Sequence, residues 1–203
     1  GNDVIIFDNL SRKGARINLN WLEEQTKSGK ILFYQADMRQ YEAVQAVFKD
    51  YPDIDVIIHQ AAQVAVTTSV SNPREDFEIN ALGTLNLLEA ARMQSSPPIF
   101  IFASTNKVYG SMEHVAIVDR NGCYEYRDLI FGVPETEPLD FYSPYGCSKG
   151  AADQYVHDYS RIYGLKTVIF RQSCIYGPRQ FGIEDQGWVA WFTIAAVLGK
   201  PLT

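Results

Sequence analysis

Short apolar runs alternate along the chain with longer stretches in which apolar residues recur every three or four positions. The runs are rich in Ile, Val and Phe, and few polar residues interrupt them, which is typical of parallel strands buried on both faces. The longer stretches have the period of amphipathic helices. This alternation predicts an α/β fold, a parallel sheet covered by helices. The predicted strands are Val4 to Phe7, Ile31 to Tyr34, Val56 to His59, Ile99 to Ala103 and Thr167 to Phe170, and the predicted helices are 15–28, 40–50, 73–94, 145–163 and 187–198.

The helix over 73–94 has the clearest pattern. Asn72 is a natural N-cap, Pro73 suits the first helical position, and Glu75 falls in the first turn. Two other stretches do not fit the alternation and are predicted as long loops, Gln60 to Ser71 and Thr105 to Ser143. Loops of that length are commonly functional, although a disordered insertion over 113–137 fits the same composition.

Composition narrows the classes of partner. No run of about 18 apolar residues is present, so neither a membrane span nor a secretory signal is expected. The net charge is −6 and no Lys/Arg cluster forms a basic face, which argues against nucleic acid. The three cysteines lack a CxxC spacing, so no disulfide framework or metal site is predicted. A cytoplasmic protein fits these features.

One part of a nucleotide-binding α/β domain is missing from the pattern. Such domains begin with a strand and a glycine-rich turn that admits a pyrophosphate, and the 14 glycines here nowhere form GxGxxG. Asp8 does end a predicted strand, where an acidic residue accepts hydrogen bonds from a ribose in such domains. An ordinary loop start fits Asp8 equally well. We therefore predict a doubly wound, Rossmann-like sheet, incomplete at its N-terminus, with two strand edges left unpaired.

Three residues form a candidate catalytic group. Tyr145 and Lys149 stand four apart at the head of a predicted helix and share one face, and Thr105 follows the strand from Ile99. An ammonium beside a phenol stabilises the phenolate, so Lys149 and a cationic nicotinamide are expected to lower the pKa of Tyr145 by about two or three units. Tyr145 would then take a proton from a substrate hydroxyl that Thr105 holds, while Lys149 binds the nicotinamide ribose. Taken alone, the YxxxK pair is equally compatible with an ordinary exposed pair.

Longer motifs add a family resemblance. The strings FDNLSR, ADMR, HQAAQV, INALGTLNLLEAAR and RQSCIYGPRQF resemble, in this order, segments of the extended short-chain dehydrogenase/reductases, and within them the nucleotide-sugar epimerases and dehydratases. The resemblance implies NAD as cofactor and a nucleotide sugar as substrate. The implied cofactor contacts are Asp8, Asn9, Ser11, Arg12, Asp37, Met38, Ala61, Ala62, Gln63, Asn80, Ser104, Tyr145 and Lys149, and the implied substrate contacts are Thr67, Asn106, Arg179 and Gln180.

Other strings resemble one branch of that family. VTTSVSNPREDFEIN, STNKVYG, SPYGCSKGAADQY and DQGWVAWF are similar to the CDP-tyvelose (CDP-paratose) 2-epimerases. The branch implies inversion at C2 of a CDP-3,6-dideoxyhexose through a transient 2-keto sugar. Dehydratase relatives have an Asp-Glu pair after the catalytic threonine, whereas Asn106 and Lys107 stand here, which disfavours loss of water. Another UDP- or dTDP-sugar epimerase or reductase, or a truncated non-catalytic domain, remain the alternatives.

The resemblance also implies an organisation. Residues 1–173 are expected to form the NAD-binding domain and 174–203 the beginning of a substrate-binding region. Relatives dimerise through the helices that correspond to 73–94 and 145–163, so a homodimer is expected. Tyr155, Tyr159 and Tyr163 form a stripe that would serve that contact or face the sheet, and His59 is expected to be packed rather than catalytic.

Overall fold

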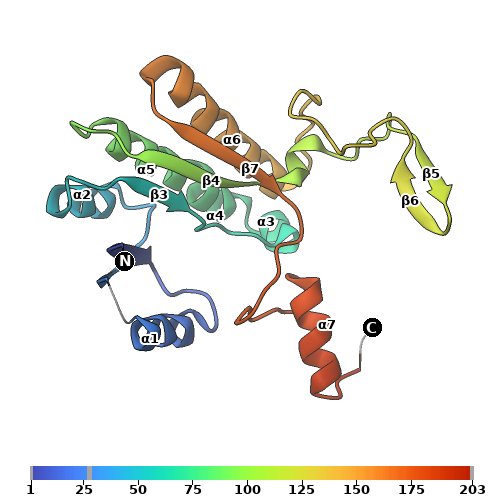
Figure 1. The fold of residues 1–203 in the computed structure, drawn as a ribbon, viewed down its shortest axis with the longest axis horizontal. Coiled ribbons are helices and arrows are strands. Elements are labelled where there is room, and N and C mark those ends of the chain that lie inside the picture. Colours follow the sequence, from blue (N-terminus) through green and yellow to red (C-terminus); the bar gives the residue numbers. More distant parts are fainter. Residues whose placement is uncertain (1, 27–28, 202–203) are drawn as a thin grey trace.

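A parallel sheet forms the centre of the molecule, as predicted (Figure 1). Helices pack on one of its faces, so its strands are not buried on both faces as their apolar runs predicted. The computed structural model describes residues 2–26 and 29–201. In this sheet β3 (Val56–His59), β4 (Ile99–Thr105) and β7 (Thr167–Gln172) lie in the order β3-β4-β7, all parallel. All three strands fall where the apolar runs placed them, although β4 and β7 are each two residues longer at their carboxyl ends.

The hydrophobic core lies between this sheet and three helices, α2 (Tyr41–Asp50), α5 (Gly83–Arg92) and α6 (Ser143–Tyr163). Phe100 and Phe102 of β4 are fully buried, and they pack with Leu88 of α5 and Val156 of α6. Burial of these large side chains is the main stabilising term, about 1.5–3 kcal/mol each. α2 packs against α5 and so joins the first part of the chain to this core.

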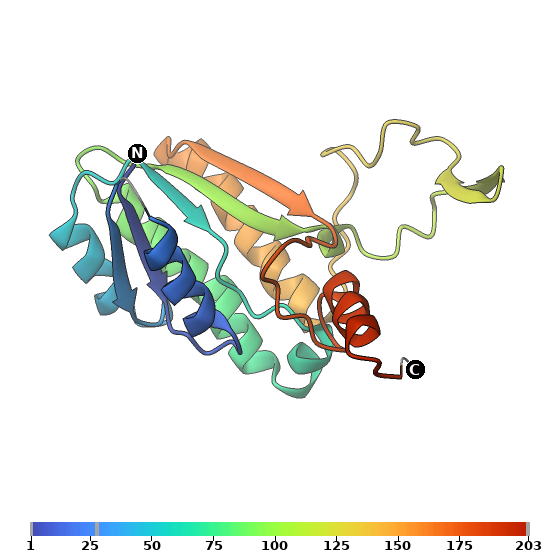
Figure 2. The same ribbon diagram turned by 60° about the horizontal axis from the view of Figure 1, so that its bottom comes forward.

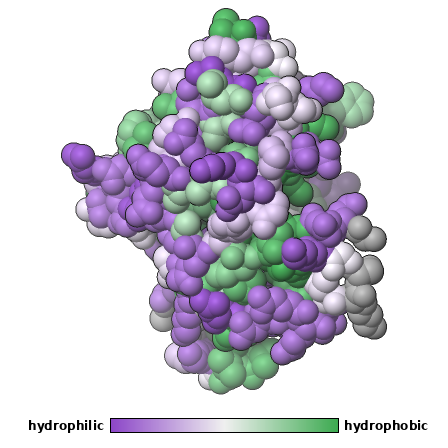
Figure 3. All heavy atoms as spheres, turned by 90° about the vertical axis from the view of Figure 1, so that its left-hand side faces the viewer, coloured by the Kyte–Doolittle hydropathy of each residue, from purple (hydrophilic) through white to green (hydrophobic). Residues whose placement is uncertain are grey.

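The sheet is split at the place where the sequence predicts a missing strand. β1 (Val4–Asp8) pairs only with β2 (Ile31–Gln35), and α1 (Ala15–Gln25) connects them. Within the described residues, β1 and β3 each keep one edge without a ladder partner, which confirms the expected unpaired edges. Apolar side chains stay exposed there, such as Ile58 at 64%. Hydrophobic residues are also visible among the hydrophilic ones on the surface that faces left in Figure 1 (Figure 3).

Both predicted loops contain regular structure that the sequence analysis missed. The stretch from Gln60 to Ser71 ends in a short helix, α3 (Val66–Ser71). The stretch from Thr105 to Ser143 contains a 3₁₀ turn (Asn106–Tyr109) and an antiparallel hairpin of β5 (Ile117–Arg120) and β6 (Cys123–Tyr126). The alternative of a disordered insertion over 113–137 is therefore wrong for the residues of the hairpin. Its arm projects away from the rest of the molecule (Figure 2).

The helix predicted over 73–94 is interrupted. Asn72 caps it as predicted, since its side chain accepts a hydrogen bond from the Glu75 amide at 3.3 Å. α4 (Pro73–Phe77) then passes into a π-helical segment (Glu78–Leu82) before α5 begins. Such π segments occur frequently at functional sites. The other helix predictions agree with the structure to within two residues, apart from the first: α1 stops at Gln25, and positions 27 and 28 of its predicted range lie outside the described residues.

α7 (Trp188–Val197) lies in the predicted substrate-binding region, whose final residues, 202 and 203, are also outside the described part. In the stripe, Tyr159 is buried in the core and its hydroxyl donates to Glu89, whereas Tyr155 and Tyr163 are about half exposed. The stripe is thus divided between the core and the surface. Across the described ranges, no helix is long and apolar enough to cross a bilayer, and no cluster of three metal-binding side chains occurs.

Candidate active site

The candidate catalytic residues meet at the carboxyl end of β4. Thr105 is its last residue, and Tyr145 and Lys149 lie on the first two turns of α6, which packs against that strand. All three are buried. In open α/β sheets this edge is the usual ligand-binding edge.

Lys149 is held firmly by the sheet. Its ammonium donates to the Ala103 carbonyl at 2.6 Å and lies 4.2 Å from the centre of the Phe102 ring, with only 3% of the residue exposed. Burial lowers the pKa of Lys149 to about 8, although the nearby carboxylates of Asp153 and Asp76 act in the opposite direction. The lysine therefore titrates much closer to neutrality than an exposed one.

Tyr145 differs from the sequence-based expectation. Burial raises the pKa of its phenol above the ordinary value, Thr105 partly offsets that effect, and the carboxylate of Asp76 adds to it. The expected lowering by Lys149 is absent in this structure, because the ammonium is directed to the Ala103 carbonyl. Any lowering of this pKa has to come from the positive charge of a bound ligand or from a shift of Lys149 toward the phenol.

A buried ion pair between Asp153 of α6 and Arg171 of β7 lies next to the candidate site. Asp153, one turn after Lys149, accepts hydrogen bonds from Arg171 at 2.9 and 3.0 Å and from Ser104 at 2.6 Å. Burial alone raises the pKa of Asp153, but the bonds from Arg171 and Ser104 reverse this and leave the pKa below its usual range. Because the Ser104 hydroxyl already donates to Asp153, any contact of Ser104 with a cofactor would come from its backbone.

The implied cofactor contacts from the first part of the chain lie at or shortly after the carboxyl ends of β1 and β2. Asp8 accepts a bond from the Leu10 amide at 2.6 Å, and Asn9 binds Asp37 at 3.0 Å and the Ser11 amide at 3.0 Å. Hydrogen bonds from Arg39 lower the pKa of Asp37 to about 2. Met38 instead turns into the core, where a Cβ on Gly83 would come within 2.7 Å of it, so its side chain is structural.

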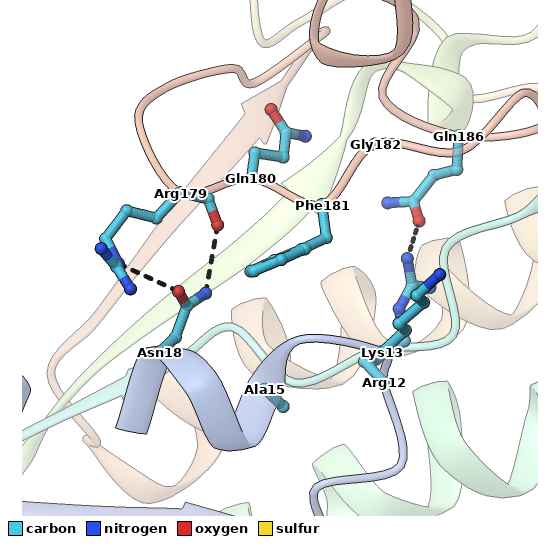
Figure 4. Close-up of a pocket in the computed structure, with 9 residues that line it drawn as sticks. All are labelled: Arg12, Lys13, Ala15, Asn18, Arg179, Gln180, Phe181, Gly182 and Gln186. Atoms are coloured by element: carbon cyan, nitrogen blue, oxygen red, sulfur yellow. Dashed lines mark hydrogen bonds between the residues drawn. The ribbon is translucent and has the colours of Figure 1, made fainter. Parts of the chain in front are cut away.

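A cavity of about 240 Å³ lies between the start of α1 and the segment 179–186 (Figure 4). It brings Arg12, expected at the cofactor, together with Arg179 and Gln180, expected at the substrate. Arg12 donates to Gln186, while Arg179 binds Asn18 at 3.1 Å and stacks on Trp21 at 4.4 Å. The guanidinium of Arg179, an implied substrate contact, is thus engaged by α1.

The remaining predicted residues lie in two groups. Gln63 lies in the loop after β3, which also carries Ala61 and Ala62. The side chain of Asn80, from the π-helical segment, accepts from the Gln63 amide and donates to the Gln63 carbonyl. Thr67 donates to Asp185, and the Asn106 amide reaches the Ser173 hydroxyl at 3.4 Å. Thr67 and Asn106 thus both contact the segment that follows β7.

The carboxyl edge retains capacity for a ligand. Gln172 pairs with Thr105 in the sheet register, and its side-chain oxygen is buried without a hydrogen-bond partner among the described residues. A buried acceptor of this kind is costly unless a donor completes it. The carboxamide of a nicotinamide and the hydroxyls of a sugar both carry such donors, so the residues present fit a dinucleotide and a sugar at this edge.

His59 is packed, as expected, and its environment predicts a pH effect. Its Nε2 lies 2.9 Å from the Thr84 hydroxyl, which donates its own proton to the Asn80 carbonyl, so His59 is the donor. Burial lowers the pKa of His59 to about 3, helped by the charge of Lys149. The unfolded chain takes up a proton near pH 6.5 and the folded one does not, so stability falls as the pH drops from about 6.5 toward 3.

We therefore expect His59→Gln, which keeps a donor for Thr84, to flatten this acid dependence. Urea unfolding at pH 7.5 and pH 5 measures it as the change in unfolding free energy between the two conditions. His157→Gln, at an exposed histidine of α6, is the control and should behave as wild type. Equal acid slopes in all three proteins would refute the assignment of His59.

Comparisons with known proteins agree with this geometry. Residues 1–186 match the family model described as GDP-mannose 4,6 dehydratase. The chain is 50% identical to CDP-paratose 2-epimerase of Salmonella typhi over an alignment that spans all of this chain and 60% of that protein. It is 35% identical to a putative UDP-glucose 4-epimerase of Methanocaldococcus jannaschii, over 94% of this chain and 53% of that one.

Solved structures show the same fold. UDP-glucose 4-epimerase of Thermus thermophilus, in complex with NAD, superposes with a TM-score of 0.75 at 34% identity, over 98% of this chain and 56% of that one. The Thermotoga maritima UDP-glucose 4-epimerase with UDP-glucose gives 0.78 at 32% identity, over 100% and 57%. The chain spans little more than half the length of these relatives. The family resemblance read from the motifs is confirmed, and the chain belongs to the GDP-mannose 4,6 dehydratase family.

Proposed function

We propose that the natural polypeptide carrying this sequence is an NAD-dependent nucleotide-sugar epimerase that inverts C2 of a CDP-3,6-dideoxyhexose. The observation that carries the proposal is the placement of Tyr145 and Lys149 on α6 beside Thr105, in a chain 50% identical to a CDP-paratose 2-epimerase. The hydride lost from C2 would return to the transient 2-keto sugar, so the reaction would be redox-neutral overall.

We assign cofactor binding, proton transfer and substrate binding to different residues according to their positions in the fold. Asp8, Asn9, Ser11, Arg12 and Asp37 would hold the adenosine side of NAD. Ala61, Ala62, Gln63, Asn80, Lys149 and the backbones of Met38 and Ser104 would hold the rest, and bound NAD supplies a reversible hydride acceptor. Thr105 orients the substrate hydroxyl and Tyr145 takes and returns its proton. Thr67, Asn106, Arg179 and Gln180 would contact the sugar nucleotide, Arg179 only after leaving Asn18.

The domain division and the homodimer that the family resemblance implies are part of what we propose. Residues 1–173 would form the NAD-binding domain and 174–203 the start of the substrate-binding region. A homodimer would form through the α4–α5 helix and α6, whose surface carries Phe77 and Tyr155, both about half exposed. A cytoplasmic location suits a nucleotide-sugar substrate.

A panel of CDP-, UDP- and dTDP-sugars, incubated with the natural polypeptide and NAD and followed by ¹H NMR, tests the proposal. We expect inversion at C2 of a CDP-linked sugar, with no solvent deuterium entering C2 because the same hydride returns. Inversion at C4 of a UDP-sugar would favour the second candidate, to which the UDP-glucose 4-epimerases are similar. NAD binding by calorimetry without conversion of any sugar would identify a non-catalytic protein.

A further inference from the structure

Asp76 is a buried carboxylate that the proposed chemistry does not use. It lies on α4, two residues before the π-helical segment begins, and only 1% of it is exposed. None of the ion pairs among the described residues includes it. Burying an ionised carboxylate without a cation is costly unless hydrogen bonds replace its water.

Three donors from three elements converge on this carboxylate. Gln63, in the loop after β3, donates to Oδ1 at 2.8 Å, and Asn80 of the π segment donates to the same oxygen at 3.2 Å. Ser148 of α6 donates to Oδ2. Bonds to a charged acceptor are stronger and more directional than neutral ones, so Asp76 fixes all three elements relative to one another.

Both ends of this network reach the candidate site. Ser148 lies between Tyr145 and Lys149 on the same helix, so its bond to Asp76 sets the rotation and height of α6 where the catalytic pair stands. Gln63 belongs to the loop expected to line the cofactor, and Asn80 clamps it by accepting from its amide at 2.9 Å and donating to its carbonyl at 3.0 Å. The π segment places Asn80 inward for this clamp.

We propose that Asp76 is a positioning residue for the reaction, which holds Tyr145 in place through Ser148 and the cofactor-side loop through Gln63. The proposal rests on the proposed function for its kinetic consequence, but not for its structural one. An apolar residue would fill the same space without fixing the three donors, so packing alone does not account for a carboxylate at this position.

The charge of Asp76 offers a second readout. Its carboxylate raises the pKa of both Tyr145 and Lys149, while Asp153 also acts on Lys149, and Lys149 in turn acts on His59. Asp76→Asn removes the charge but keeps an oxygen for Gln63 and Asn80, and the Ser148 hydroxyl can turn to accept from the new amide. Asp76→Ala removes the charge and the acceptor together.

The test compares both variants with wild type and with Asp158→Ala, an exposed carboxylate position of α6, in the natural polypeptide. We expect Asp76→Ala to lower kcat by about 10- to 100-fold in folded protein, because small displacements of catalytic groups have effects of that size. Asp76→Asn should keep most of kcat and move the acid limb of the pH–rate profile to lower pH. Asp158→Ala should match wild type in both.

A measurement without turnover separates this inference from the proposed function. In protein labelled with ¹³C at the tyrosine ring, the Tyr145 signal, assigned with Tyr145→Phe, should titrate at lower pH in Asp76→Asn than in wild type. If wild type converts no sugar while this shift is seen, the proposed function fails and the inference stands. If the titration is unmoved and Asp76→Ala retains the wild-type kcat, losing only thermal stability, Asp76 is merely structural and the inference is overturned.

Discussion

Tyr145→Phe is expected to lower the kcat of the natural polypeptide by about 10²- to 10⁴-fold, the usual contribution of a positioned acid–base group. The substitution removes one oxygen from a buried side chain and leaves the ring in its place, so the fold and the binding of NAD should persist. Steady-state rates on the substrate identified by the sugar panel, with NAD affinity by calorimetry, measure the two effects separately.

Tyr155→Phe provides a matched control. Tyr155 lies on the same helix but is 48% exposed, so its loss should leave kcat unchanged. If Tyr145→Phe inverted its substrate at a rate within threefold of wild type, the phenol would not be the base. Thr105 and Lys149 would then need new roles.

Arg171→Met is expected to lower the free energy of unfolding by about 3–5 kcal/mol at pH 7, because it leaves the fully buried Asp153 carboxylate without its cation. The sign of the pH dependence follows from Asp153, whose pKa in the folded protein is below its usual range. The stabilisation is present above the ordinary carboxyl pKa of about 3.9 and is lost as the pH falls below it. Urea unfolding at pH 7 and pH 3.5 measures both differences.

Two further variants isolate the ion pair. Arg161→Met removes the cation of an exposed pair with Asp158 on α6 and should cost less than about 1 kcal/mol. The double variant Asp153→Leu/Arg171→Met leaves no unpaired charge and should recover part of the loss. A loss at Arg171 no greater than that at Arg161 would show that water, not arginine, solvates Asp153.

Period and composition were sufficient to predict the parallel strands and the approximate positions of most helices. Each predicted strand lies within one residue of the observed start, because unbroken Ile, Val and Phe runs favour an extended, pleated conformation. Their burial on both faces was predicted wrongly, since alternate residues of β3 and β7 stay exposed or half-buried. The split sheet was also predictable, since a doubly wound order needs a strand between β1 and β3. These features depend on local pattern and on topology.

The features that were missed depend on side chains distant in sequence. A hydrophobic stripe does not distinguish a continuous α-helix from one with a π segment, whose extra residue is stabilised by the inward bonds of Asn80. The hairpin did carry a local sequence signal, the dipeptide Asn121-Gly122. Both residues have the positive φ that a two-residue hairpin turn requires. Its flanking residues are exposed and largely polar, which obscured it.

The site was predicted by residue type but not by environment. Tyr145, Lys149 and Thr105 lie together as expected, yet the Ala103 carbonyl that binds Lys149 is a backbone group that no pattern displays. In the sequence, Asp76 cannot be distinguished from any other polar helix residue. Its role depends on a hydrogen bond from Ser148, which lies 72 positions later in the chain. The engagement of Arg179 by Asn18 is likewise a contact across the fold.

The division of the sheet has a consequence for cooperativity. Among the described residues, no backbone ladder links the β1-β2 pair to the β3-β4-β7 sheet, so the two parts are coupled through side-chain packing, such as that of Phe7 against the core. Side-chain packing transmits less constraint than a shared row of backbone bonds. On heating, β1, α1 and β2 should open as a separate unit before the core melts. The unfolding transitions followed by far-UV and near-UV circular dichroism should then fail to coincide.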